Sequence, residues 1–180
     1  MRHGEPKLAG RLLGHTDCAV LPAGIAACRA AAAGVKVDRV VTSDLRRAAD
    51  CGVAIATDLS VPLHVDARWR ELDFGQWDGL ATADVDAAAL GRFWDDPDAA
   101  PPPAGERWSA LLARVAGALD AIDGPTLVVS HAGAIRAALV AACGFDRRQG
   151  WAFDLPYGSV LSLRLWRGDA PAAQITGLRA

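Results

Sequence analysis

Two short apolar segments, each followed at once by a helix-forming segment, place the strongest limit on what this chain can fold into. DRVVTS (38–43) is rich in β-branched residues and runs into the helical segment 44–59. PTLVVS (125–130) is a continuous apolar run of the kind buried in parallel sheets, and HAGAIRAALVAACG (131–144) follows it as a helix closed by Gly144. Repeated strand–helix units predict an α/β fold built on a parallel sheet.

The rest of the chain supplies further helices and shorter strands. Pro22 opens an alanine-rich helix that ends near Gly34, and two closing strands turn at Gly168–Asp169 as a hairpin at a sheet edge. The other expected elements are a strand over 61–67, a glycine-punctuated loop over 71–80, helices over 82–96 and 106–122, and a stiff proline-rich connection over 98–105.

Composition excludes several classes of protein. The 180 residues are 52% hydrophobic, and we expect one domain over 1–180. The formal charge of -2, with both signs scattered, gives no basic stripe for nucleic acid and no membrane patch, and the apolar runs are too short for a membrane span. Four cysteines without a CxxC pair predict a cytoplasmic protein, and no motif predicts a metal site. Oligomeric state is left open.

Candidate anion ligands fall at equivalent places on three predicted strands. His3 follows what little strand precedes it, Arg46 and Arg47 lie in the first turn after the strand over 38–43, and His131 stands where the strand over 125–130 becomes a helix. The carboxyl ends of parallel strands meet at one sheet edge, where helix N-termini favour anions. Two histidines and two arginines there predict a phosphate site.

Four blocks resemble the signatures of the histidine phosphatase superfamily, the phosphoglycerate mutase-like proteins, in the family order. They are Arg2-His3-Gly4-Glu5, SDLRRA (43–48), ELDFGQWDG (71–79) and SHAGAIRA (130–137). The resemblance covers nearly the whole chain. It implies a three-layer α/β/α sandwich with a mostly parallel central sheet, and phosphoryl transfer through a phosphohistidine without a cofactor.

The resemblance gives the basic residues their expected roles. His3 is the nucleophile, and Arg2 and Arg47 hold the phosphoryl oxygens with planar guanidinium groups. The family pattern selects Arg47, so Arg46 is expected to be exposed. His131 is expected to donate to the same oxygens; the alternative is a core histidine bonded to a carbonyl.

Glu71 is the expected general acid, which protonates the leaving alkoxide and then activates water. Asp73 is the second candidate for this role, and an ordinary solvated carboxylate is the remaining interpretation of Glu71. Gly14 and the backbone N–H of Ala132 are expected to contact the substrate.

The expected substrate is a small phosphorylated metabolite. The chain has little room for the insertions of the cofactor-dependent mutases and lacks their Asn after the RHG block, which favours a phosphatase. RELDFGQWDG and DLPYGSV are similar to the α-ribazole phosphatase branch, so α-ribazole 5′-phosphate is the particular candidate. Ala104-Gly105-Glu106-Arg107 departs from the family's Gly-Gly-Glu-Ser, expected near the substrate mouth, where Arg107 would favour a more acidic substrate. The alternatives are a broad-specificity phosphatase, a phosphoglycerate mutase paralogue, and a degenerate member that binds phosphate without turnover.

The first residues raise a separate expectation. Family members have several apolar residues before RHG that form a central strand, and here Met1 alone stands in their place. We therefore expect the natural protein to begin upstream, and residues 1–4 of this chain to be mobile or rearranged.

Overall fold

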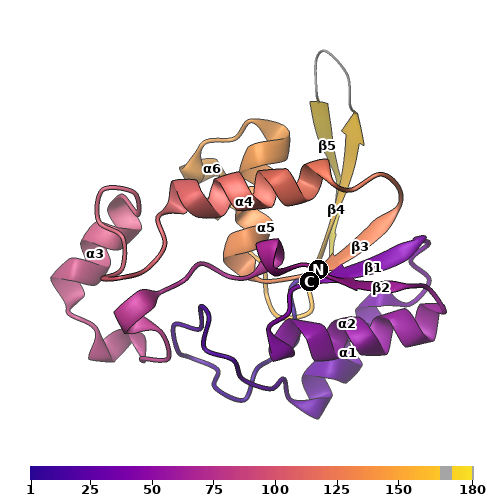
Figure 1. The fold of residues 1–180 in the computed structure, drawn as a ribbon, viewed down its shortest axis with the longest axis horizontal. Coiled ribbons are helices and arrows are strands. Elements are labelled where there is room, and N and C mark those ends of the chain that lie inside the picture. The colour runs from indigo at the N-terminus through magenta and orange to yellow at the C-terminus, as the bar shows by residue number, and fades with distance from the viewer. Residues whose placement is uncertain (167–171, 180) are drawn as a thin grey trace.

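The computed structural model describes residues 1–166 and 172–179 and has an α/β fold (Figure 1). Three strands, β1 (Arg39–Thr42), β2 (Leu63–Val65) and β3 (Thr126–Val129), form a parallel sheet in the order β2–β1–β3. β4 (Val160–Trp166) and β5 (Ala172–Arg179) form an antiparallel hairpin that stands above the sheet in Figure 1. The expected hairpin turn at Gly168–Asp169 lies outside the described residues.

Helices cover both faces of the sheet, because successive side chains of a strand point to opposite sides. On one face Val40 packs with α1 (Pro22–Ala32) and α2 (Arg46–Leu59). On the other face Val41 packs with α4 (Trp108–Asp120) and α5 (Ala132–Cys143). The two apolar clusters give the three-layer α/β/α arrangement that the sequence led us to expect (Figure 1).

Two helical segments differ from the expected ones. The helix expected over 82–96 is a 3-10 turn, Thr82–Asp84, followed by α3 (Ala87–Asp95), because the Asp86 side chain caps the N–H of Ala89 and starts a new helix. The short α6 (Arg147–Trp151) was not expected. It begins at a capping box in which Asp146 and Gln149 bond each other's backbone N–H groups.

The first three residues lie in line with the sheet, between β3 and β4. The N–H of His3 donates to the Ser130 carbonyl at 2.9 Å, and the N–H of Arg2 donates to the Ser159 carbonyl at 2.9 Å. Gly4 comes so close to the helix α1 that an added Cβ would lie 2.3 Å from the Gly24 carbonyl oxygen. In place of the expected rearrangement, these residues have strand-like bonds, and His3 is 5% exposed.

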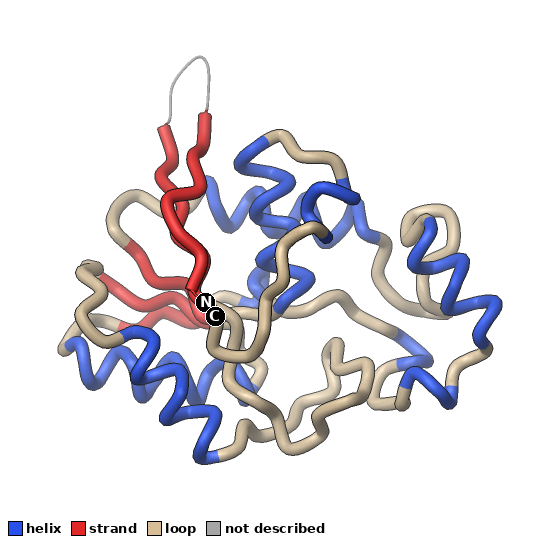
Figure 2. Tube along the Cα trace, turned by 180° about the vertical axis from the view of Figure 1, so that it is seen from behind, coloured by secondary structure: helices blue, strands red, loops and turns tan. Residues whose placement is uncertain are grey.

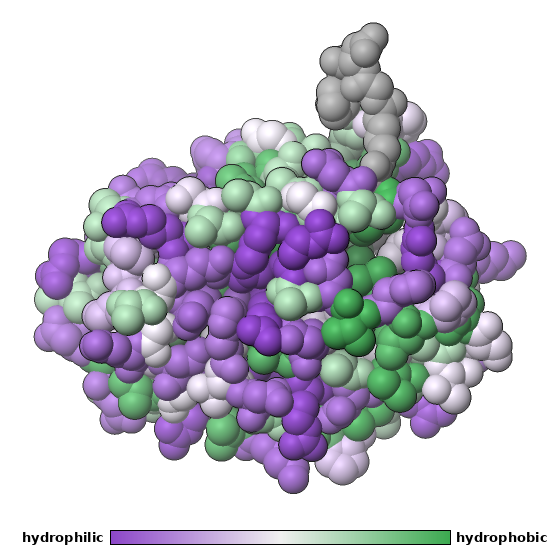
Figure 3. Space-filling view, in the orientation of Figure 1, coloured by the Kyte–Doolittle hydropathy of each residue, from purple (hydrophilic) through white to green (hydrophobic). Residues whose placement is uncertain are grey.

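An apolar groove continues from Met1 between the facing edges of β3 and β4. It has a volume of about 740 Å³, and its walls include Leu127, Val128, Leu161 and Leu163. Figure 3 shows hydrophobic surface near the base of the hairpin. Figure 2, seen from behind, shows the base of the hairpin beside the N-terminus.

Candidate active site

His3 and His131 lie together at the carboxyl end of the sheet. The N–H of His3 donates to the carbonyl of Ser130, which directly follows β3, and His131 is the next residue, the N-cap of α5. Their ring centroids are 5.0 Å apart, and the Tyr157 ring lies 5.5 Å from that of His3. Residues separated by 128 positions in the sequence thus face one another because their strand segments are hydrogen-bonded.

The environment of His3 keeps its imidazole neutral and fixes one tautomer. Its Nδ1 lies 2.6 Å from the Gly4 carbonyl oxygen and donates to it, which leaves the lone pair on Nε2. Burial lowers the pKa of His3 to about 3, against the effect of the Gly4 carbonyl, and the charges of Arg47 and Arg2 lower it further. A neutral imidazole with a free Nε2 lone pair has the form that a nucleophile needs.

The second histidine is also neutral. Complete burial lowers the pKa of His131 well below its ordinary value, and the charges of Arg47 and other nearby arginines lower it further. It therefore presents one ring N–H donor without a positive charge of its own.

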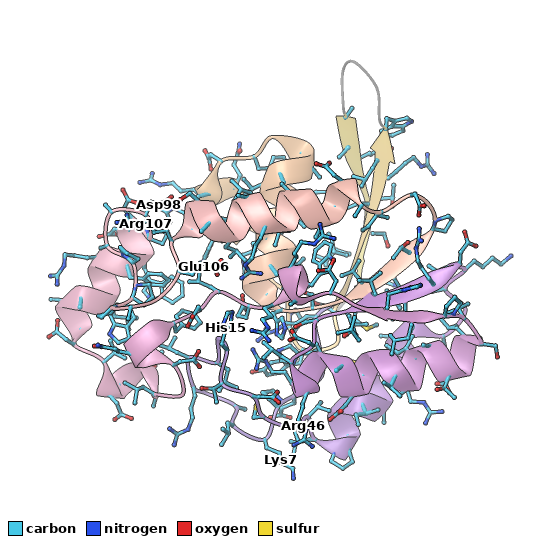
Figure 4. All side chains as sticks on the ribbon, in the orientation of Figure 1. Lys7, His15, Arg46, Asp98, Glu106 and Arg107 are labelled. Atoms are coloured by element: carbon cyan, nitrogen blue, oxygen red, sulfur yellow. The ribbon has the colours of Figure 1, made fainter. Side chains whose placement is uncertain are left out.

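Arg47 and Arg2 lie beside the histidine pair, each held by backbone carbonyls. Arg47 is 0% exposed and donates to the carbonyls of Leu13, Gly14 and Thr16 at 2.6 to 2.9 Å. The Arg2 guanidinium donates to the Leu155 carbonyl and lies 4.0 Å above the centre of the Tyr157 ring. Arg46, by contrast, is exposed and lies at the lower edge of the molecule in Figure 4.

Several buried nitrogen atoms have no hydrogen-bond partner, and those of Arg2, Arg47 and His131 belong to residues beside His3. Within the described residues the unpartnered atoms are Nε of Arg2, Nε of Arg47 and both ring nitrogens of His131, together with Nε2 of His15 and Nε of Arg136. Buried polar groups in folded proteins nearly always have partners. A cluster of unpartnered cationic and imidazole nitrogens is suited to bind an anion.

Glu71 lies against the N-terminus of α5, next to the histidines. Its carboxylate accepts two backbone hydrogen bonds, from the N–H of Gly133 at 3.1 Å and from the N–H of the adjacent Leu72 at 3.0 Å. Asp73 faces elsewhere: it accepts the N–H of Gly75, and its other oxygen is 3.5 Å from Nδ1 of His15. Of the two candidate acids, Glu71 is the one that contacts the turn following His131.

A partly buried ion pair that could not be expected from the sequence holds the Glu71 segment in place. Arg114 forms a two-pronged bond with Glu106 and also donates to the carbonyls of Arg68, Arg70 and Glu71. Glu106 in turn accepts the N–H of Asp73. Glu106 belongs to the Ala104–Arg107 block that departs from the family pattern, but the spacing of residues does not identify Arg114 on α4 as its partner.

Gly14 and the N–H of Ala132, both expected to contact the substrate, lie in different surroundings. An added Cβ at Gly14 would lie 2.4 Å from the Leu72 carbonyl oxygen, and the N–H of Gly14 already donates to Asp78. What requires glycine there is the close approach of two loops of the protein itself. Ala132 begins α5 beside Gly133, so its N–H belongs to the helix terminus that faces Glu71.

The expected effect of Arg107 on the choice of substrate stays a prediction. Arg107 is exposed and donates to the Asp98 carbonyl, and Figure 4 shows both residues far from His15. The residues that line the site but escaped the sequence analysis are Tyr157 and Arg136, which come from the segments after β3.

Neither a metal cluster nor a membrane helix is found in the described part of the chain. Within residues 1–166 and 172–179, no three His, Cys, Asp or Glu side chains gather as metal ligands do. In the same residues, every helix is too short or too polar to cross a bilayer.

Comparison with known proteins gives the class. The model of the histidine phosphatase superfamily (branch 1) matches residues 1–175, so the chain belongs to this superfamily. It is 33% identical over 162 residues to a glucosyl-3-phosphoglycerate phosphatase of Mycobacterium tuberculosis, covering 79% of this chain and 72% of that protein. It is 25% identical over 183 residues to an adenosylcobalamin/alpha-ribazole phosphatase of Salmonella typhimurium, covering 94% and 91%.

Among solved structures, a mycobacterial glucosyl-3-phosphoglycerate phosphatase superposes with a TM-score of 0.85 at 26% identity, covering 97% of this chain and 94% of that one. The fold is therefore phosphoglycerate mutase-like, as expected, and the chain is a phosphatase of this superfamily. The α-ribazole branch is among the relatives, but the mycobacterial relatives share the higher identity.

The two neutral histidines make stability depend on pH. Unfolded histidines take up a proton below about pH 6.5, whereas His3 with its pKa of about 3 does not, and His131 is shifted in the same direction. The unfolded state thus binds more protons in this range, so stability is full above pH 6.5 and falls as the pH drops toward 3. For His3 we expect a loss of about 2 kcal/mol between pH 7.5 and 5.

Urea unfolding at a series of pH values measures this slope. His3→Ala should flatten it, while His64→Ala, at an exposed histidine, should leave it unchanged. An unaltered slope in His3→Ala would show that His3 is protonated in the folded protein.

Proposed function

We propose that this chain hydrolyses phosphate monoesters of small metabolites through a covalent phosphohistidine formed on His3. The observation that carries the proposal is the set of buried, unpartnered nitrogens of Arg2, Arg47 and His131 around a neutral His3. Guanidinium forks and an imidazole N–H match the several oxygens of a phosphoryl group. Their convergence on one nucleophilic nitrogen supports phosphoryl transfer rather than simple anion binding.

In the first step, Nε2 of His3 forms a bond to phosphorus while the bond from phosphorus to the alcohol oxygen breaks. Arg2, Arg47 and His131 donate hydrogen bonds to the phosphoryl oxygens, whose charge is redistributed as the transition state forms. Glu71 acts as the general acid and transfers a proton to the departing oxygen.

In the second step, the Glu71 carboxylate takes a proton from water as the water oxygen attacks phosphorus. The bond between phosphorus and nitrogen breaks, inorganic phosphate leaves, and His3 returns to its neutral form. Atoms and charges balance in both steps without a cofactor.

Two substrates are favoured by separate observations. The sequence blocks favour α-ribazole 5′-phosphate, and the name of the Salmonella relative contains the same compound. The name of the M. tuberculosis relative points to glucosyl-3-phosphoglycerate, at higher identity. Both compounds are phosphate monoesters of small metabolites, and hydrolysis of such a monoester is the coarser proposal. The proposed location of the protein is the cytoplasm.

We expect the purified chain to hydrolyse p-nitrophenyl phosphate in the presence of EDTA, and vanadate to inhibit it tightly, because vanadate mimics five-coordinate phosphorus. A solved structure of a mycobacterial glucosyl-3-phosphoglycerate phosphatase, with a TM-score of 0.85 and 27% identity to this chain, is a complex with VO3. Steady-state assays on both candidate substrates then rank them. Loss of activity in EDTA that Mg²⁺ restores would contradict the mechanism, and tight phosphate binding without turnover would favour the degenerate member.

A further inference from the structure

A second pocket adjoins the candidate active site on the far side of Glu71. It has a volume of about 140 Å³, and Glu71, Ala132 and Gly133 form its boundary with the site. Most of its wall is aromatic or apolar, contributed by α3, α4, α6 and the Glu71 loop: Leu72, Phe74, Phe93, Trp94, Pro97, Trp108, Leu111 and Trp151. Since Glu71 is the group expected to protonate the leaving oxygen, this pocket lies where the alcohol part of a substrate would extend.

Arg136 is a cation in the wall of this pocket that is only partly bonded. It follows Gly133 by three residues on α5, so both lie on one face of the helix. One amino group donates to the Phe153 carbonyl at 3.2 Å, but its Nε is buried and has no partner among the described residues. The guanidinium carbon lies 5.4 Å from the centre of the Trp151 ring.

The other arginine in the wall is already used by the protein. Arg147 donates to the carbonyls of Trp94 and Asp95 and thereby ties the start of α6 to the end of α3. Arg136 is therefore the cation in this wall that retains a buried, unpartnered N–H, and burial lowers its pKa while the charge of Glu71 opposes that shift.

The charges change when Glu71 takes up its catalytic proton. Glu71 is then neutral, and Arg136 loses the carboxylate that partly balances it, while Arg2 remains a nearby cation. A buried cation without a balancing anion is costly. An acidic group on the substrate restores the balance.

We propose that this pocket binds a carboxylate carried by the alcohol part of the substrate, and that Arg136 is the residue that recognises it. The inference rests on the proposed phosphatase function. A planar carboxylate fits the guanidinium fork, and the aromatic wall keeps water from competing. Arg136 thus selects acidic alcohols, while His3 and its neighbours bind the phosphate itself.

The test uses two substrates that differ in one group. 3-Phosphoglycerate carries a carboxylate where glycerol 3-phosphate carries a hydroxymethyl group. We expect kcat/KM to be at least about tenfold higher for 3-phosphoglycerate. In Arg136→Gln this ratio should fall to near one, because the variant loses the advantage that the carboxylate gives to 3-phosphoglycerate. Arg148→Gln, which removes the same charge from an exposed position of α6, should keep the wild-type ratio.

Each outcome separates the two proposals. Absence of p-nitrophenyl phosphate hydrolysis by the wild type overturns the proposed function. Hydrolysis with a wild-type ratio near one, or a ratio that Arg136→Gln leaves unchanged, overturns the carboxylate site alone. If Arg136→Gln melts well below the wild type, Arg136→Lys, which keeps the charge but not the planar fork, should give an intermediate ratio; an unchanged ratio there counts against recognition by Arg136.

Discussion

Replacing His3 by alanine should abolish turnover, with kcat on p-nitrophenyl phosphate reduced on the order of 10⁴-fold or more. The loss is this large because the proposed covalent bond forms at Nε2, and alanine offers no atom for it. In the wild type, the Gly4 carbonyl accepts from Nδ1 and burial keeps the imidazole neutral, so Nε2 carries a free lone pair. The alanine variant has no ring for these contacts to act on. Steady-state rates measure the loss of turnover, and the melting temperature shows whether the variant is folded.

His64→Ala is the matched control, since His64 is exposed on β2 and lies outside the candidate site; it should keep full activity. In the wild type, rapid denaturation in alkali during turnover should trap a phosphorylated peptide that contains His3. A His3→Ala variant that folds and retains near-normal rates would end the phosphohistidine mechanism.

Replacing Glu71 by glutamine should slow substrates with poor leaving groups by about 10² to 10⁴-fold and p-nitrophenyl phosphate far less. An alkoxide cannot depart without a proton, whereas a p-nitrophenolate can. Glutamine preserves the size of the side chain and one carbonyl acceptor for the N–H of Gly133, so the turn after His131 should stay in place. The measurement is kcat/KM for both classes of substrate in the wild type and the variant.

Asp73→Asn is the comparison, because Asp73 was the other candidate acid and contacts Gly75 and His15 instead of α5. It should affect both classes of substrate alike. Equal losses on both classes in Glu71→Gln, together with a selective loss in Asp73→Asn, would transfer the acid role to Asp73.

The parts of the site that could be predicted from the sequence are those set by local pattern. An apolar run followed by a helix predicts where a strand ends, so His131 could be placed at the start of α5. A helix turns by about 100° per residue, so one of Arg46 and Arg47 had to face outward, and the structure buries Arg47.

What could not be predicted depends on contacts between distant segments. Arg114 holds the Glu71 segment across 43 positions, and nothing in the local sequence around either residue signals that bond. Tyr157 meets Arg2 and His3 because the segment before β4 passes over the first residues.

The groove between β3 and β4 bears on local stability. In the described sheet β1 is paired on both sides, by β2 and β3, whereas β4 pairs with β5 alone and turns its other edge to the groove. Backbone amides exchange their hydrogens through local openings, and those with fewer neighbouring strands open at lower free energy. The protein is therefore unevenly protected: amides of β1 should exchange only when the whole molecule unfolds, while those of the hairpin exchange through smaller openings that leave the centre of the sheet intact.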